Sequence, residues 1–132
     1  METQPVVFVV DSDPAAVSSL AAMLGSQGLV VRAYTSGEQF LEDFDRSQCG
    51  CLVIDVQTSG MGGLDFQEHL RAEGISLPVI VVAARGNVRM AVRAIRSGAV
   101  DFLEKPYRAY ELSQSIRKAL RQRPSHLASE AH

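Results

Sequence analysis

Short apolar runs, separated by segments of helical period, limit the folds open to this chain more than any other feature. Four runs rich in valine, isoleucine or phenylalanine predict strands buried on both faces: residues 6–10, 51–54, 78–83 and 101–103. A fifth run, residues 29–34, alternates more and is typical of a strand nearer the edge of a sheet. The sequence therefore predicts five strands.

Two helices are predicted from their N-terminal signals. Asp13 followed by Pro14 is typical of an N-cap with proline at the first helical position, and this helix should close at Gly25 or Gly28. A second cap is predicted at Ser36, because Gln39 follows three residues later as in a capping box.

Three further helices follow along the chain. The third is predicted over residues 63–73, stopped by Gly74, and the fifth over residues 110–121, before Pro124. The fourth is capped by Asn87, and its apolar residues recur at successive turns: Val88, Ala91, Val92 and Ile95.

Five strands that alternate with five helices predict an α/β fold: one doubly wound (βα)5 domain with a five-stranded parallel sheet. We expect the domain over residues 1–121 and a tail or the start of a linker over residues 122–132. Ligands of such folds bind at the carboxyl ends of the strands.

The composition excludes several classes of protein. The chain has 132 residues, of which 46% are apolar and 21% charged, and its net charge of -2 does not favour nucleic-acid binding by this domain. No apolar run is long enough to span a bilayer and the N-terminus does not match a signal peptide, so a cytoplasmic location is expected. Cys49 and Cys51 lie too close for a disulfide and are too few for a zinc site.

The residues that follow the strands carry the candidate chemistry. Asp11 follows the first strand, Asp55 the third and Lys105 the fifth, so two acids and a lysine should converge on one cleft. A buried carboxylate needs a cation, a metal or hydrogen-bond donors nearby. Lys105 is the expected partner of both carboxylates.

Four segments in this order resemble receiver domains of bacterial two-component response regulators: VVD at 9–11, LVID at 52–55, GMGGL at 60–64 and GAVDFLEKP at 98–106. The resemblance covers about residues 6–120 and is nearest to the FixJ-type subfamily, in which a LuxR-type DNA-binding domain follows the receiver. It implies a flavodoxin-like sheet of order 2-1-3-4-5 and a signalling module that is not an enzyme. A flavodoxin-like electron carrier is disfavoured, since the chain has no tryptophan to stack on a flavin.

The resemblance also implies the roles of individual residues. Asp55 would accept a phosphoryl group from a sensor histidine kinase, and Lys105, before a cis proline, would contact the phosphoryl oxygens. Magnesium would be held by Asp11, Asp55 and the backbone carbonyl of Gln57. Ala83 stands where the family has a switch hydroxyl, and Phe102 at the aromatic switch position.

Three departures from the family pattern bear on this chemistry. Ser12 replaces the second acid, so magnesium affinity should be weakened. Ala83 has no hydroxyl to bond a phosphoryl oxygen, and Thr58-Ser59 replace a common Met-Pro pair. Two hypotheses stay open: a receiver phosphorylated weakly or conditionally on Asp55, and a pseudo-receiver that signals through protein binding alone.

A basic stripe on the fourth helix has two interpretations. It is either a solvated face or part of a homodimer interface in which opposite charges cross the two-fold axis. The residues of the second interpretation are Arg89, Arg93, Arg96, Asp101 and Glu104. A DNA-binding output domain or a partner regulator is the expected receiver of the signal, and no membrane partner is expected.

Overall fold

The structure is a computed structural model that describes residues 4–58 and 60–122. The strands are β1 (Val6–Val10), β2 (Val30–Tyr34), β3 (Gly50–Asp55), β4 (Val79–Ala83) and β5 (Asp101–Glu104). The helices are α1 (Pro14–Gly25), α2 (Gly37–Asp43), α3 (Gly63–Ala72), α4 (Val88–Arg96) and α5 (Ala109–Arg121). Residues 123–132, most of the predicted tail, lie outside the described residues.

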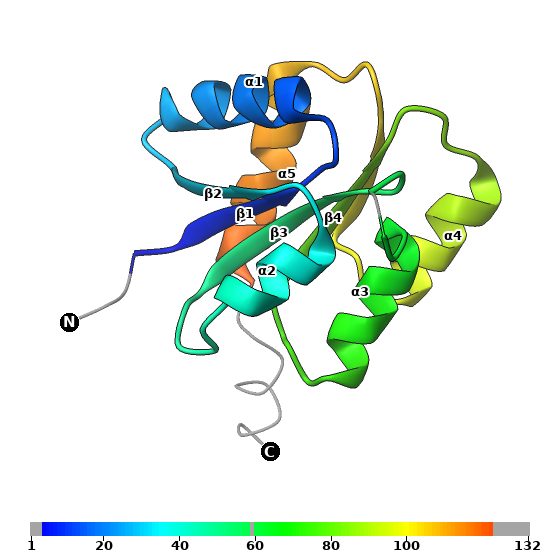
Figure 1. Cartoon of the computed structure of the whole chain (residues 1–132). Coiled ribbons are helices and arrows are strands. Elements are labelled where there is room, and N and C mark those ends of the chain that lie inside the picture. Colours follow the sequence, from blue (N-terminus) through cyan, green and yellow to red (C-terminus); the bar gives the residue numbers. More distant parts are fainter. Residues whose placement is uncertain (1–3, 59, 123–132) are drawn as a thin grey trace.

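All five strands form one parallel sheet in the order β2-β1-β3-β4-β5, as predicted (Figure 1). The strands are in register across the sheet: Val10 of β1 pairs with Ile54 of β3, which in turn pairs with Val81 of β4. Because these strands end together, Asp11 and Asp55 emerge side by side at the carboxyl edge of the sheet.

Two hydrophobic cores lie on the two faces of this sheet. Helices α2, α3 and α4 cover one face, where Phe40 makes edge-to-face contacts with Phe8 and Phe66 at ring-centroid distances of 5.3 and 6.0 Å. Helices α1 and α5 cover the other, with Leu24, Leu112 and Ile116 among the residues packed against the strands. A sheet buried on both faces explains why the central strands read as continuous apolar runs.

The predicted N-caps are confirmed. Asp13 accepts a hydrogen bond from the Ala15 backbone at 3.0 Å, Ser36 from Gln39 and Asn87 from Met90. The second half of the capping box differs, because Gln39 Oε1 accepts from the backbone of Thr35. These caps fix where α1, α2 and α4 begin, directly after the loops that follow β1, β2 and β4.

One expectation about burial is wrong. The strand predicted at residues 101–103 is not buried on both faces, because β5 is an edge strand and its residues are half-buried or exposed. The apolar residues of α4 largely face solvent: Val88, Val92 and Ile95 are 77%, 41% and 49% exposed. The fully buried residue of α4 is the small Ala94.

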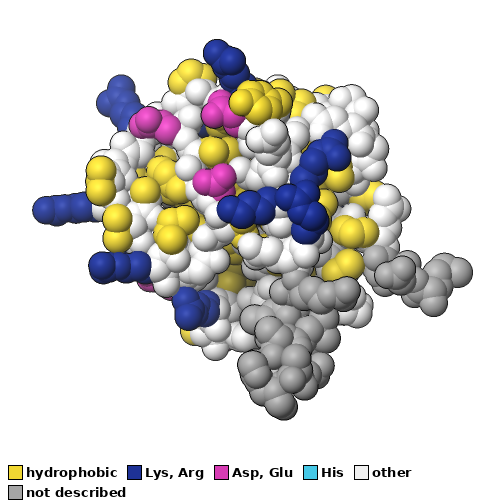
Figure 2. Space-filling model, turned by 180° about the vertical axis from the view of Figure 1, so that it is seen from behind, with side chains coloured by type: hydrophobic (Ala, Val, Ile, Leu, Met, Phe, Trp, Pro, Cys, Tyr) yellow, Lys and Arg dark blue, Asp and Glu magenta, His cyan; other side chains and the backbone are white. Residues whose placement is uncertain are grey.

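No helix among the described residues has the length and hydrophobicity needed to cross a membrane. On the face shown in Figure 2, Lys and Arg side chains are scattered among acidic and hydrophobic ones. They do not gather into one continuous basic patch on that face.

Candidate functional site

A lysine and two carboxylates meet at the carboxyl edge of the sheet. Lys105 Nζ lies 2.6 Å from Asp55 Oδ2 and 3.1 Å from Asp11 Oδ2. Asp11 and Asp55 are buried, and Lys105 is half-buried. The structure thus brings together the three side chains that the strand-end argument predicted to converge.

In each carboxylate, one oxygen contacts Lys105 and the other accepts a hydrogen bond from a backbone N–H. Asp11 Oδ1 accepts a hydrogen bond from the backbone of Asp13 at 3.0 Å, and Asp55 Oδ1 accepts from the backbone of Gln57 at 2.7 Å. These bonds hold both carboxyl groups in a fixed orientation. The Lys105 ammonium supplies the positive charge that two buried carboxylates need.

Lys105 owes its position to the end of β5 and to the proline that follows. The Lys105-Pro106 peptide bond is cis, as the resemblance implied, and the Lys105 backbone N–H donates to Ala83 O at 2.7 Å. Burial alone would lower the pKa of the Lys105 ammonium, but the hydrogen bonds to Asp55 and Asp11 outweigh it, so that this pKa is raised. Lys105 therefore stays charged at neutral pH.

Ser12 lies beside the site and supplies a neutral oxygen. Its hydroxyl donates to the backbone carbonyl of Gln57 at 3.3 Å. No group of three His, Cys, Asp or Glu side chains suited to a metal occurs within residues 4–58 and 60–122. Asp11, Asp55 and the Gln57 carbonyl offer the hard oxygen donors that magnesium prefers, with two negative charges.

Ala83 and Phe102, the two expected switch residues, lie next to the loop that follows β4. Ala83 is buried at the end of β4 and presents only a methyl group. The loop that follows is bonded to β5: Gly86 N–H donates to Glu104 Oε2 at 3.0 Å. The ring of Phe102 lies against the same glycine, where a Cβ atom would approach it to 2.8 Å. This contact with Glu104 was not predicted from the sequence.

Thr58 is a site residue that sequence reasoning undervalued. It is buried, and its hydroxyl donates to the backbone carbonyl of Asp55, closing the turn directly after the candidate phosphoacceptor. Ser59 lies outside the described residues. Gly63 seals the same turn from α3, because a Cβ atom there would lie 2.4 Å from Asp55 O. The sequence signal was a small polar residue at a position where the family resemblance implied methionine.

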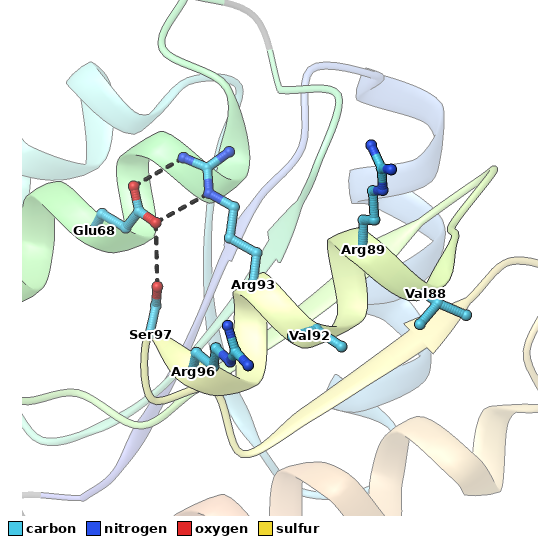
Figure 3. A pocket seen from close by; sticks show the side chains of 7 residues that line it. All are labelled: Glu68, Val88, Arg89, Val92, Arg93, Arg96 and Ser97. Atoms are coloured by element: carbon cyan, nitrogen blue, oxygen red, sulfur yellow. Dashed lines mark hydrogen bonds and ion pairs between the residues drawn. The ribbon is translucent and has the colours of Figure 1, made fainter.

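The charged residues of the predicted dimer surface are largely engaged within the chain. Arg93 forms ion pairs with Asp65 and Glu68 of α3, and its hydrogen bonds with them raise its pKa (Figure 3). Asp101 Oδ2 accepts from Ser115 at 2.6 Å, and Glu104 binds Gly86 as described.

A few members of the predicted dimer surface remain open to solvent on α4. Arg89 and Arg96 are exposed, and in Figure 3 Val88 and Val92 point away from α3. These four residues line a shallow pocket of about 440 Å³ beside Arg93.

Comparison with known proteins agrees with this geometry. The family model described as response regulator receiver domain matches residues 7–117. The response regulator protein TodT of Pseudomonas putida is 43% identical over 119 residues, which are 90% of this chain and 52% of TodT. The transcriptional regulatory protein FixJ of Bradyrhizobium diazoefficiens is 34% identical over 99% of this chain and 64% of its own length.

A solved structure points the same way. The crystal structure of FixJ-N is similar with a TM-score of 0.81 at 33% identity, covering 92% of this chain and 98% of that one. The chain spans about half the length of TodT, so activities of the whole relatives do not transfer to it directly. Receiver domains are signalling modules rather than catalytic enzymes, and they typically bind Mg²⁺. The family match, the fold and the strand-end residues agree, and the chain belongs to the response regulator receiver domain family.

Proposed function

We propose that this chain is an atypical receiver that accepts a phosphoryl group weakly or conditionally on Asp55 from a histidine kinase. The observation that carries the proposal is the 2.6 Å contact between Lys105 Nζ and Asp55 Oδ2 at the carboxyl edge of the sheet. The acid and its cation are in place, whereas Ser12 and Ala83 lack the charge and the hydroxyl of a complete pocket.

The reaction needs only one carboxylate oxygen of Asp55. That oxygen attacks phosphorus, the phosphorus–nitrogen bond of the kinase phosphohistidine breaks, and the electron pair leaves on the imidazole nitrogen, which takes up a proton. The Gln57 N–H on Oδ1 keeps the carboxylate oriented during the attack. Lys105 Nζ contacts Oδ2 in the unphosphorylated site, and after the transfer it would pair with the negatively charged phosphoryl oxygens.

Bound magnesium would be held by Asp11, Asp55 and the Gln57 carbonyl. It would neutralise charge on the phosphoryl group, and these hard oxygen donors suit it. The Ser12 hydroxyl at 3.3 Å from the Gln57 carbonyl contributes an oxygen without charge. We therefore propose that magnesium binds more weakly here than in a receiver with a second acid.

A phosphorylation-independent pseudo-receiver is the alternative. The charges of the site support this alternative, because Lys105 already forms ion pairs with Asp11 and Asp55 in the absence of a phosphoryl group. It is also favoured by Ala83, which offers no hydrogen bond through which a phosphoryl group would move the β4–α4 loop. In this alternative the domain signals through its protein contacts alone.

We further propose that α4 carries a homodimer contact in this chain. The support is the exposed apolar stripe of Val88, Val92 and Ile95, flanked by Arg89 and Arg96. Exposed apolar residues in a row are typical of protein contacts rather than of solvated helices. Since Arg93 is bound to α3, the apolar stripe and not this arginine would carry most of the contact.

The output of the domain belongs to this proposal as well. Relatives such as FixJ are transcriptional regulatory proteins and are longer than this chain. We propose that the receiver passes its state to a DNA-binding output domain or to a partner regulator, and that the domain itself does not contact DNA.

Transfer from an autophosphorylated histidine kinase tests the proposal. Radiolabelled phosphate should appear on the parent chain, should be released by hydroxylamine as expected of an acyl phosphate, and should be absent from Asp55→Asn. Label that resists hydroxylamine, or that persists in Asp55→Asn, would rule out Asp55 as the acceptor. Absence of label from the parent would favour the pseudo-receiver.

A further inference from the structure

The backbone carbonyls at the C-terminal end of α4 accept hydrogen bonds from side chains of α3. The last carbonyls of a helix lack a regular partner within the helix and can accept bonds from neighbouring segments. Gln67 Nε2 donates to Ala94 O at 2.9 Å, and Arg71 Nη1 donates to Arg96 O at 3.3 Å. Gln67 and Arg71 are four residues apart and therefore lie on the same face of α3. Helix α3 thus holds the end of α4 through the α4 backbone itself.

The bond from Gln67 lies inside the protein. Gln67 is 2% exposed, and its Oε1 has no hydrogen-bond partner among the described residues, so the amide bonds α4 alone within them. A buried hydrogen bond is stronger than the same bond in water, because the local dielectric constant is low and water does not compete. Movement of α4 away from α3 would leave the Gln67 amide and the Ala94 carbonyl buried without each other.

An ion-pair network at the surface joins the same two helices (Figure 3). Arg93 of α4 donates to Glu68 of α3 twice, from Nε to Oε2 at 3.0 Å and from Nη2 to Oε1 at 2.8 Å. Ser97 Oγ donates to the same carboxylate at 3.2 Å. Exposed ion pairs contribute little to stability, but a bidentate arginine fixes the orientation of the groups that it joins. The C-terminal half of α4 is therefore bound to α3 both in the interior and at the surface.

The opposite end of α3 packs against the turn that follows Asp55. The Gly63 N–H donates to Val56 O at 3.0 Å, and a Cβ atom on Gly63 would lie 2.4 Å from Asp55 O and 2.9 Å from Val56 Cα. The backbone of the turn and the first residue of α3 are thus in direct contact. Because close-packed groups transmit a displacement, a shift of the Asp55 carbonyl would move the start of α3.

The other connection from Asp55 to α4, through the β4–α4 loop, lacks one of its parts in this chain. Ala83 ends β4 with a methyl group where the family resemblance implied a hydroxyl. The loop that follows is bonded to β5 by the Gly86 N–H and Glu104 Oε2. A phosphoryl group on Asp55 would therefore meet no side-chain donor at Ala83 through which to move this loop.

We propose that α3 carries a displacement of the turn after Asp55 to the C-terminal end of α4, with Gln67 and Arg71 as the side chains that transmit it. This inference deepens the proposed function, because it connects Asp55 to the exposed surface of α4 without the hydroxyl that Ala83 lacks. It rests on that function for its biological input, whereas the link between the two helices requires no phosphoryl group. Energetic coupling of this kind is measured by combining substitutions at the two ends of the link.

Nuclear magnetic resonance of the whole 132-residue chain tests the link. Thr58→Val keeps the shape of the side chain, removes the hydroxyl that donates to Asp55 O and so disturbs the turn. The expected result is a change in the amide resonances of residues 96–99, at the end of α4. The same substitution made in a Gln67→Met or an Arg71→Met background should change those resonances several-fold less.

Ser113→Ala provides the matched control background. It removes a hydrogen bond between other parts of the fold, from Ser113 of α5 to Gln27 Oε1 directly after α1 at 2.9 Å. In this background Thr58→Val should change the amide resonances of residues 96–99 as much as it does in the parent. A reduction there equal to that in the methionine backgrounds would show general loosening of the fold and would contradict a route through α3.

Hydrogen exchange gives a second readout of the same link. The amides of Ser97 and Ala99 donate to carbonyls of α4, and they should exchange several-fold faster in Gln67→Met than in the parent while the strand amides stay protected. If Gln67→Met does not fold, Arg71→Met decides the question, because Arg71 is exposed.

Two results would overturn the inference. One is an α4 whose resonances ignore Thr58→Val in the parent, and the other is an α4 that responds to it equally in the methionine backgrounds. Neither measurement uses a phosphoryl donor, so a failure here is distinct from a failure of the proposal about Asp55.

Discussion

Lys105 reaches across the carboxyl edge of the sheet to Asp55, with 2.6 Å between Nζ and Oδ2, and its ammonium also contacts Asp11 at 3.1 Å. The three residues come from the ends of β5, β3 and β1 and are far apart in the sequence. Their contact is the structural basis of the proposed phosphoacceptor, and it has consequences for stability, metal binding and reactivity.

The stability of the cluster should depend on pH at the alkaline end. The raised pKa of Lys105 means that the folded state binds its proton more tightly than the unfolded state. The stabilisation is complete below about pH 10.4, the unperturbed lysine value, and is lost as the pH rises above it.

Comparison with Lys105→Met isolates this effect. The variant should be less stable than the parent at neutral pH, since two buried carboxylates lose their cation. Urea unfolding at a series of pH values should give a constant difference in free energy of unfolding up to about pH 10, which then narrows. A difference that stays constant through alkaline pH would contradict the assigned ion pair.

Magnesium affinity should be limited by the uncharged Ser12. Ser12→Asp restores a negative charge beside the Gln57 carbonyl and should tighten magnesium binding by about 10- to 100-fold, from about 1.5–3 kcal/mol for a charged partner. Calorimetric titration measures this directly. Ser18→Asp, which adds the same charge on the exposed side of α1, should leave the affinity unchanged. Equal gains in both variants would mean that bulk charge, not the site, governs binding.

The turn after Asp55 should tolerate no side chain at Gly63. The added Cβ atom of Gly63→Ala would lie 2.4 Å from Asp55 O, so α3 or the turn must shift, at a cost of about 1–3 kcal/mol. Gly25→Ala is the control, because a Cβ atom there meets nothing within 4 Å and alanine favours the helix. Urea unfolding of both variants should separate them, and equal stability would show that the turn is loosely packed.

The apolar stripe of α4 should govern self-association. Ile95→Asp places a charge in the stripe and should shift the sedimentation coefficient of the protein toward that of a monomer. Val30→Asp, a comparably exposed valine on the opposite edge of the sheet, should not. A parent that is already monomeric, or an Ile95→Asp variant that sediments like a dimeric parent, would contradict the proposed contact.

Charge reversal at Arg93 would not test the dimer specifically. Arg93 holds α3 through Asp65 and Glu68, so its loss would loosen the contact between two helices of the same chain. The substituted helix would change its position whether or not a partner subunit is present.

Much of the fold could be predicted because its determinants are local. Valine-rich runs mark strands covered on both faces, and caps at Asp13, Ser36 and Asn87 mark helix starts. The convergence of Asp11, Asp55 and Lys105 followed from the rule that parallel strands end at a common edge.

The features that could not be predicted from the sequence depend on which segments of the chain lie next to each other in the fold. Helical periodicity shows that α4 has an apolar face, but not that this face is left without a neighbour. The bond between Glu104 and Gly86, and the bond from the Gln67 side chain to the Ala94 carbonyl, are likewise tertiary features. A residue's type and its spacing from others in the sequence do not encode such partners.

The rate of phosphorylation at Asp55 tests the central claim most directly. Incubation with acetyl phosphate and magnesium, followed by intact-protein mass spectrometry over time, should reveal a slow adduct of one phosphoryl group on the parent and none on Asp55→Asn. Ser12→Asp/Ala83→Thr should react at least about tenfold faster, since about 1.4 kcal/mol of regained stabilisation suffices for that factor. A parent that reacts as fast as the double variant, or an adduct that survives in Asp55→Asn, would contradict the account.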